Sequence, residues 1–149
     1  MRHERLGAAA AHRWPLTVAL MAALGGCGGS GGSGKKVGKE LEKIASTART
    51  TSLVAAQWSQ GRVPDVYAAQ MACLVDRQLD QERRRPVWRQ AAPDVGPPAL
   101  ALIDGTAALA RRLAAAVEGG NLGGAATLAS EGADLAGRAD QLRRQAGGS

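Results

Sequence analysis

The segment KKVGKELEKIASTARTTSLVAAQWSQ, residues 35–60, decides the fold class of this chain. Its apolar and small residues recur at alternating spacings of four and three, at Val37, Leu41, Ile44, Ala48, Thr51, Ala55 and Trp58. Such spacing keeps one stripe of a helix turned toward a neighbouring helix over many turns. The pattern therefore predicts a long helix that packs along its whole length.

A second helix is expected from Pro64 to about Arg84. Gly61 can end the first helix, and Pro64 suits a helix start because its fixed φ is already helical. Pro86 ends the second helix, since proline lacks the backbone donor that a helix interior needs. The apolar side expected to face the core carries Tyr67, Met71, Leu74, Val75 and Gln78.

The return from Pro86 to Pro98 is rich in proline, and its VWRQAA stretch is expected to form a short helical turn that buries Trp88. A third helix begins near Pro98. The tripeptide GGN, residues 119–121, combines a C-capping glycine with an N-capping asparagine and predicts a tight turn between two helices. The fourth helix has leucines seven apart with small residues between them: Leu128, Leu135 and Leu142 with Ala125, Gly132 and Ala139.

No segment alternates apolar and polar residues as a half-buried strand does. We therefore predict an all-α protein, an antiparallel up-down-up-down four-helix bundle over residues 35–147. Its core should be rich in alanine, because the sequence contains no phenylalanine, three tryptophans and one tyrosine.

The first residues of the chain have the composition of an export signal. Arg2, Arg5 and Arg13 stand against the single acid Glu4, and the apolar segment Trp14–Leu24 follows. A helix needs about 20 apolar residues to cross a bilayer, so this segment is too short to remain as an ordinary membrane span. A basic start followed by a short apolar stretch predicts a signal peptide that is removed.

The residues Leu24, Gly25, Gly26 and Cys27 resemble the lipobox of bacterial lipoproteins. The resemblance covers residues 1–27 and implies a diacylglyceryl thioether on Cys27, cleavage after Gly26 and acylation of the new amino group. The chain then divides into a signal peptide (1–26), a lipidated cysteine with a flexible Gly/Ser linker (27–34) and the bundle (35–147). The alternative is a cytoplasmic protein whose first apolar helix has no targeting role.

Removal of residues 1–26 changes the chemistry that the chain can perform. Both histidines, His3 and His12, leave with that segment, and so does the general base of most hydrolases. A zinc site would also need imidazoles or thiolates that the mature chain lacks. We predict no catalytic residue, no metal site and no cofactor.

If Cys27 carries the lipid, Cys73 is the only free thiol of the mature chain. We expect it to be partly shielded and inert, with a covalent homodimer as the alternative.

The signal segment holds three arginines and one glutamate, so 16 of 19 basic and 12 of 13 acidic residues remain, a net charge of +4. In an up-down bundle this positive net charge is expected at the anchored end, where basic residues are attracted to anionic lipid. The cations expected to contact the membrane surface are Lys35, Lys36, Lys39, Arg83, Arg84, Arg85, Arg143 and Arg144. The alternative is that the arginines only complement the dipoles of helix C-termini. Nucleic-acid binding is not expected, because aromatic residues are not interleaved with these cations.

The sequence therefore predicts a non-enzymatic interaction or structural module, anchored by lipid in the cell envelope, that recruits another envelope protein. The alternative function is a carrier that holds a small ligand or lipid in the bundle core. Gly28 stands where an aspartate would favour retention at the inner membrane. We therefore favour the outer membrane, facing the periplasm, or the outer face of the cell membrane in a host with one membrane.

Overall fold

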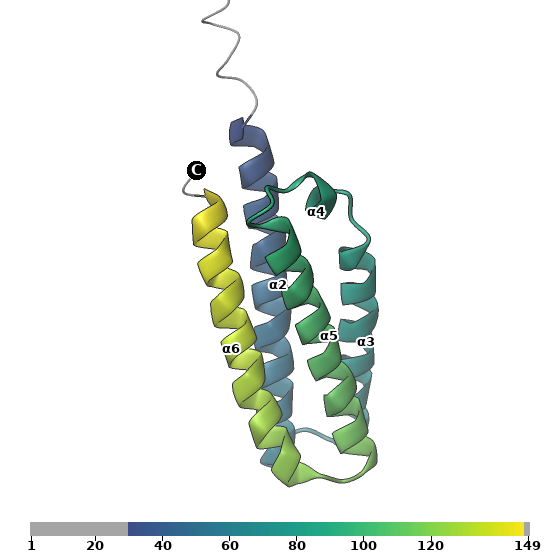
Figure 1. The fold of residues 1–149 in the computed structure, drawn as a ribbon. Coiled ribbons are helices and arrows are strands. Elements are labelled where there is room, and N and C mark those ends of the chain that lie inside the picture. Colours follow the sequence, from purple (N-terminus) through teal and green to yellow (C-terminus); the bar gives the residue numbers. More distant parts are fainter. Residues whose placement is uncertain (1–29, 148–149) are drawn as a thin grey trace, which may run out of the picture. The chain divides into compact units, whose positions relative to one another are not determined.

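The computed structural model describes residues 30–147, which form five helices and contain no strand (Figure 1). These are α2 (Ser30–Ser59), α3 (Asp65–Arg83), α4 (Val87–Gln90), α5 (Gly96–Glu118) and α6 (Leu122–Gly147). The all-helical prediction is confirmed. The signal peptide, the lipobox and Cys27 lie outside the described residues.

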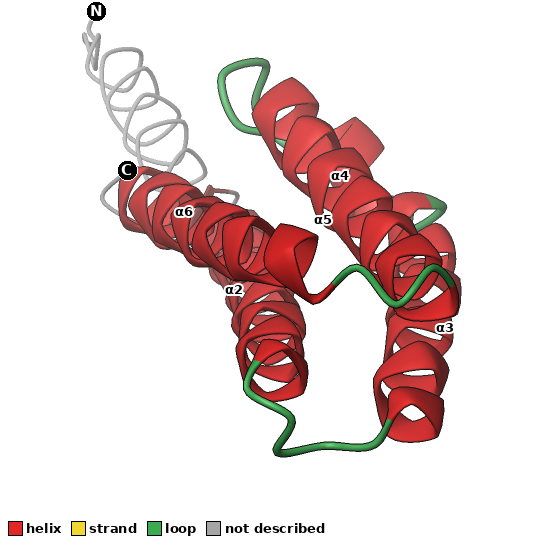
Figure 2. Ribbon diagram, turned by 90° about the horizontal axis from the view of Figure 1, so that it is seen from below, coloured by secondary structure: helices red, strands yellow, loops and turns green. Residues whose placement is uncertain are grey.

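The four long helices form a helical bundle, and the short α4 lies across one end of it. Figure 2 shows α2 beside α6 and α3 beside α5. Contacts join α3 to α5, α5 to α6 and α4 to α5, so α5 has neighbours on several sides. α5 accordingly buries apolar residues over much of its surface, including Leu102, Ile103, Leu109 and Leu113.

The first helix is longer than predicted, because α2 begins at Ser30 and residues 30–34 continue it. These residues were expected to belong to the flexible linker. Extending an existing helix costs far less than starting one, so the helix can continue into a glycine-rich stretch. Gly34 also packs closely on α6, where a Cβ would lie 3.2 Å from the carbonyl oxygen of Ala146.

The core stripe predicted for α2 is confirmed. All seven of its members are buried: Val37, Leu41, Ile44, Ala48, Thr51, Ala55 and Trp58. The hydroxyl of Thr51 donates to the backbone oxygen of Thr47 at 3.0 Å, which satisfies a polar group inside the core. The indole N–H of Trp58 donates to Asp65 Oδ1 at 2.7 Å and so joins the end of α2 to the start of α3.

Of the core stripe predicted for α3, Val75 is buried and Met71 is half-buried against the core, whereas the prediction is wrong for Tyr67, Leu74 and Gln78. The buried residues of α3 are Ala68, Ala72, Val75 and Leu79. Tyr67 and Leu74, expected inside, keep 45% and 58% of their surface exposed. The prediction placed the largest apolar side chains in the core. The small side chains of Ala68 and Ala72 instead occupy it, because small residues at a contact let two helices approach closely.

The predicted short helical turn that buries Trp88 is confirmed, and as α4 it forms a lid across one end of the bundle. α4 buries Trp88, whose indole N–H donates to the backbone oxygen of Glu82 at 2.9 Å. α5 begins directly beneath it at Gly96, where a Cβ would lie 2.8 Å from the carbonyl oxygen of Trp88. The glycine thus permits the close contact between the lid and the first turn of α5.

The predicted turn between α5 and α6 is also confirmed. Gly120 has φ +64°, a conformation that favours glycine. The backbone N–H of Gly124 donates to Asn121 Oδ1 at 3.0 Å, so the asparagine caps α6. Of the three leucines expected inside α6, Leu128 and Leu142 are buried and Leu135 is half-buried.

Candidate functional site

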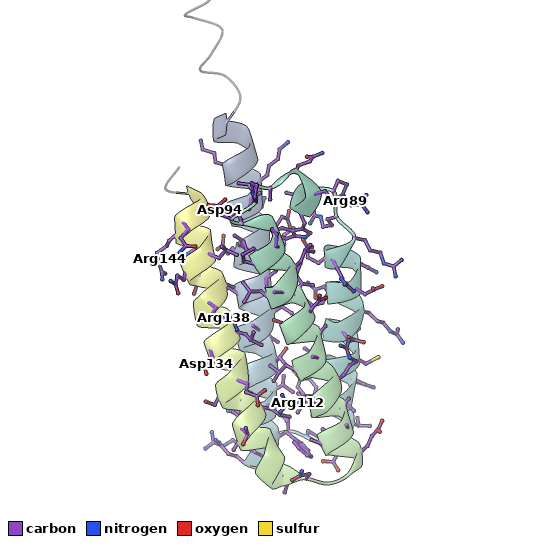
Figure 3. The ribbon with its side chains drawn as sticks, viewed as in Figure 1. Arg89, Asp94, Arg112, Asp134, Arg138 and Arg144 are labelled. Atoms are coloured by element: carbon purple, nitrogen blue, oxygen red, sulfur yellow. The ribbon has the colours of Figure 1, made fainter. Side chains whose placement is uncertain are left out.

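Five exposed cations gather at the end of the bundle where α2 begins, and we call this surface the basic end. It comprises Lys35, Lys36 and Lys39 on α2, Arg89 on α4 and Arg144 on α6. Figure 3 shows Arg89 and Arg144 at this end, whereas Arg112 lies toward the opposite end. None of the five makes an ion pair with another residue in the range 30–147. Their charge is therefore directed at solvent.

The remaining cations predicted to contact membrane lie near the same end but are held by acids of the chain. Arg83 and Arg84 pair with carboxylates of α5 and α3, and Arg143 lies between acids of α6 and α2. The distances are 3.1 Å for Arg83–Asp104, 2.9 Å for Arg84–Asp80, 3.8 Å for Arg143–Asp140 and 3.9 Å for Arg143–Glu42. These pairs leave little net charge on their part of the surface.

Arg85 has a structural role that was not predicted from the sequence. Its Nη1 donates to Glu40 Oε2 at 2.6 Å and to Glu82 Oε2 at 3.2 Å, and Lys43 donates to the same Glu40 oxygen at 2.8 Å. Glu40 and Arg85 are 45 positions apart, so only the alignment of α2 with the end of α3 brings them together. The hydrogen bonds of this cluster hold the C-terminal end of α3, next to α4, against α2.

The pKa values of the two carboxylates of this cluster shift in opposite directions. Burial raises the pKa of Glu82, and the negative charge of nearby Glu40 raises it further, despite the opposing effect of Arg85. Burial also acts to raise the pKa of Glu40, but the hydrogen bond from Lys43 and the charge of Arg85 outweigh it and lower that pKa. Glu40 is therefore the carboxylate that the cluster stabilises in its charged form.

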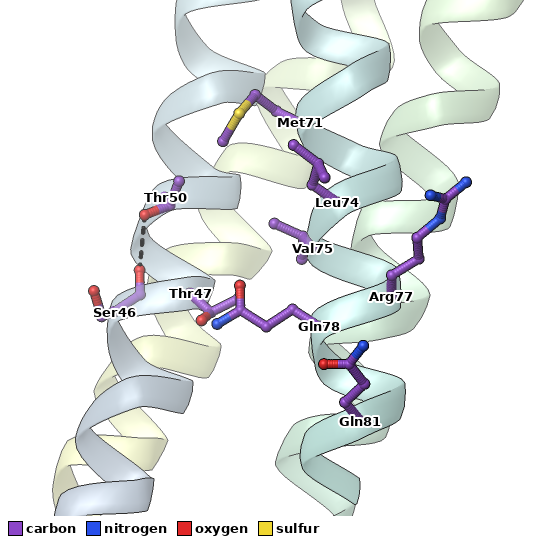
Figure 4. Close-up of a pocket in the computed structure, with 9 residues that line it drawn as sticks. All are labelled: Ser46, Thr47, Thr50, Met71, Leu74, Val75, Arg77, Gln78 and Gln81. Atoms are coloured by element: carbon purple, nitrogen blue, oxygen red, sulfur yellow. Dashed lines mark hydrogen bonds between the residues drawn. The ribbon is translucent and has the colours of Figure 1, made fainter.

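A second surface is the groove between α2 and α3, which encloses about 590 Å³ (Figure 4). Its α2 side is polar, with Ser46, Thr47 and Thr50. Figure 4 shows Met71 of α3 pointing toward Thr50 and Gln78 toward Thr47. The groove is thus lined by hydroxyl and amide groups together with apolar side chains. We call it the α2–α3 groove.

Two apolar side chains of α3 line this groove, half-buried Met71 and exposed Leu74. Exposed Tyr67 recurs with them at spacings of four and three, so it lies on the same face of α3. Leu53, with 60% of its surface exposed, falls on the same face of α2 as Ser46 and Thr50. An apolar patch rimmed by polar groups is typical of a binding surface.

The core beside the groove has no room for a ligand. Between Val54, Ala72 and Leu113 the side chains leave no volume that a water molecule could occupy. Close packing of this kind is the normal state of a protein interior. Whatever binds at the α2–α3 groove therefore meets a surface and does not enter the core at this place.

Cys73 is exposed, on the side of α3 turned away from the core. Because Ala68, Ala72 and Val75 face the core, Cys73 is turned about 100° away from Ala72 toward solvent. A covalent homodimer through Cys73 stays an alternative.

Within residues 30–147, no three His, Cys, Asp or Glu side chains lie close enough to hold a metal ion. No helix in this range is both long enough and apolar enough to cross a membrane.

Comparison with protein-family models, curated proteins and solved structures gives no match for this chain. The function therefore has to be argued from the basic end and the α2–α3 groove. Sequence reasoning missed the groove because it assigned Tyr67, Met71 and Leu74 to the core. The available signal was the four-residue spacing of Ala68 and Ala72, which offers a closer helix contact than the larger residues do.

Proposed function

We propose that the chain is a bacterial lipoprotein whose helical domain is a non-enzymatic interaction module of the cell envelope. Its signal peptide is removed and Cys27 carries the lipid anchor. In a host with two membranes the domain faces the periplasm from the outer membrane, and otherwise it lies on the outer face of the cell membrane. The order of basic start, short apolar segment, small residues and cysteine in residues 1–27 supports this anchor.

The domain is an antiparallel up-down-up-down four-helix bundle in this proposal. Contacts between neighbouring helices support that topology. Trp58 near the end of α2 bonds Asp65 at the start of α3, whereas Glu40 near the beginning of α2 bonds Arg85 beyond the end of α3. Further ion pairs in the same sense are Arg111–Asp76, Arg112–Glu131 and Arg49–Asp140. Each is expected when helices that lie side by side in the bundle run in opposite directions.

The partner docks on the α2–α3 groove in this proposal. The observation that carries it is the apolar face of α3, where exposed Leu74 and half-buried Met71 line the groove beside polar Ser46 and Thr50, and exposed Tyr67 lies on the same face. An amphipathic helix of a partner protein fits such a groove, because its apolar face covers the leucine and methionine while polar groups meet the hydroxyls. The tight core next to the groove favours this recruiting role over a ligand carrier.

Photo-crosslinking in intact cells tests the docking site. A photoreactive residue replaces Leu74 in the groove, and the matched control carries it at Arg138, an exposed position on α6. The proposal predicts a discrete protein adduct from residue 74 and none from residue 138. Adducts consisting only of lipid or small molecules would contradict recruitment and favour the carrier. The same protein adduct from both positions would place the partner elsewhere.

A further inference from the structure

The basic end has a charge that the rest of the bundle does not neutralise. All four lysines of the sequence lie within residues 35–43, and Lys43 alone among them is paired, with Glu40. Around the basic end, Asp94 is the only acid of the described chain without an ion pair. Five unpaired cations therefore face one unpaired carboxylate. Such an excess attracts an anionic surface.

Helix dipoles do not explain where these lysines are. Cations near a helix C-terminus are stabilised by the dipole, which accounts for Arg83 and Arg144. Lys35, Lys36 and Lys39 lie instead in the N-terminal turns of α2, where the dipole gives a cation no stabilisation. Their clustering on this end requires another reason.

The covalent chain limits how far the basic end can move from the proposed anchor. Three residue steps separate Cys27 from Ser30, and an extended chain spans at most about 3.6 Å per residue, or roughly 11 Å. From Ser30 to Lys39 the helix rises about 14 Å. The Debye length at physiological salt is about 8 Å, so the short tether lets this surface approach the headgroup charges closely enough to interact when the tether is not fully extended.

We propose that the basic end rests on anionic headgroups of the membrane that carries the anchor, through Lys35, Lys36, Lys39, Arg89 and Arg144. Arg83 and Arg85 instead pair with acids of α5 and α2, and Arg84 pairs with Asp80 of α3. This inference rests on the proposed anchorage at Cys27, and it adds the lipid class that the domain contacts and the residues that make the contact. The basic end then keeps the α2–α3 groove away from the bilayer and open to a partner.

Amine footprinting of the lipidated protein tests the contact. The protein is extracted from membranes and reconstituted in vesicles of phosphatidylcholine alone or of an equimolar mixture with phosphatidylglycerol. Lysines are acetylated briefly and read by mass spectrometry. A cation close to an anionic surface gains about 1 kcal/mol, which corresponds to roughly a fivefold change in occupancy. We expect Lys35, Lys36 and Lys39 to be acetylated about fivefold more slowly on the anionic vesicles, with the effect lost at high salt. Lys43 should change less, because Glu40 already holds it.

Matched variants separate direct contact from overall charge. The double variant R89Q/R144Q removes two cations of the basic end and should reduce the protection of the lysines. The control R62Q/R138Q removes the same charge from positions outside the basic end and should not. The pair deletion R84Q/D80N, which leaves the net charge unchanged, should also have no effect. Equal acetylation on both kinds of vesicle would overturn the contact, and so would equal loss of protection in R89Q/R144Q and R62Q/R138Q.

The intact mass of the same preparation reports the anchor separately. A lipidated mass with unprotected lysines would overturn the headgroup contact and leave the anchor in place. An unlipidated mass would overturn the anchor itself, and protection of the lysines by anionic vesicles would then measure the charge attraction alone. Failure of the contact and failure of the anchor thus give different results.

Discussion

Gly132 of α6 lies against Ser52 of α2 so closely that a Cβ added at residue 132 would come 2.9 Å from Ser52 Cβ. The same added atom would lie 3.0 Å from Leu109 Cδ2 of α5. The Ser52 hydroxyl donates to the backbone oxygen of Ala129 at 2.6 Å across this contact. Three helices therefore meet at a position that has no space for a side chain.

Gly132→Ala is expected to destabilise the domain. Alanine improves helix propensity by about 1 kcal/mol, but forcing a methyl group into a packed contact costs about 1–3 kcal/mol. Urea unfolding should therefore show a lower free energy of unfolding for Gly132→Ala than for the unchanged protein. Gly137→Ala on the same helix is the matched control, because a Cβ there meets nothing within 4 Å, and it should be stabilising by up to about 1 kcal/mol. Equal effects of the two substitutions would contradict the close contact.

Asn121→Ala should cost about 1 kcal/mol of unfolding free energy, because it removes the side-chain oxygen that caps the backbone N–H of Gly124. Asn121→Asp keeps an acceptor at the same place and should retain most of the stability. Urea midpoints of the two variants check this. A loss in the aspartate variant as large as in the alanine variant would show that the cap is not the cause.

The cluster of Glu40, Glu82 and Arg85 predicts opposite effects of two conservative substitutions. Glu40→Gln should destabilise the domain at neutral pH by about 1–2 kcal/mol, since charged hydrogen bonds from Arg85 and Lys43 are weakened. Glu82→Gln should have little effect or stabilise slightly, because it removes a carboxylate whose charged form burial disfavours.

The pH dependence follows from the same pKa directions. The pKa of Glu40 is lowered by folding, so its contribution is present above its ordinary value of 4.5 and is lost as pH falls through the folded pKa. The pKa of Glu82 is raised, so its contribution is present below 4.5 and is lost as pH rises through the folded pKa. Urea unfolding measured at neutral pH and below pH 4.5 should therefore show that Glu40→Gln lowers the free energy of unfolding less in acid. A larger loss in acid would contradict these pKa directions.

Leu74→Lys should separate recruitment from folding. The side chain is 58% exposed, so the free energy of unfolding, measured with urea, should change by no more than about 0.5 kcal/mol. A charge in the apolar part of the α2–α3 groove should nevertheless abolish the crosslinked adduct, here captured from a probe at Gln78. Leu122→Lys, an exposed leucine outside the groove, is the control and should keep the adduct.

The sequence was sufficient where a single helix carries its own pattern. The stripe of α2 is continuous over seven positions from Val37 to Trp58, so its buried face follows from spacing alone. Gly120 and Asn121 were recognisable for a similar reason, because the chemistry of a helix turn is local. The burial of Trp88 followed from its place between prolines that end one helix and begin another.

The sequence was insufficient where a feature depends on how two helices approach. α3 is turned so that Ala68 and Ala72 face α5, and this rotation exposes Cys73 and the leucine at position 74. Its apolar residues are compatible with more than one face, and only packing against α5 decides between them. The pairing of Arg85 with Glu40 depends in the same way on the alignment of α2 and α3. The α2–α3 groove and the Glu40–Arg85 pair therefore became visible only in three dimensions, whereas four of the five cations of the basic end were predicted from the sequence.

The mass of the chain extracted from cell membranes decides whether the domain is anchored by lipid. We predict a mature protein that begins at Cys27, with a diacylglyceryl group on the sulfur and an acyl group on the amino nitrogen. Cys27→Ala should abolish this mass, whereas Cys73→Ser should retain the lipid. A mature chain that begins elsewhere, or one that begins at an unmodified Cys27, would contradict the lipid-anchored module.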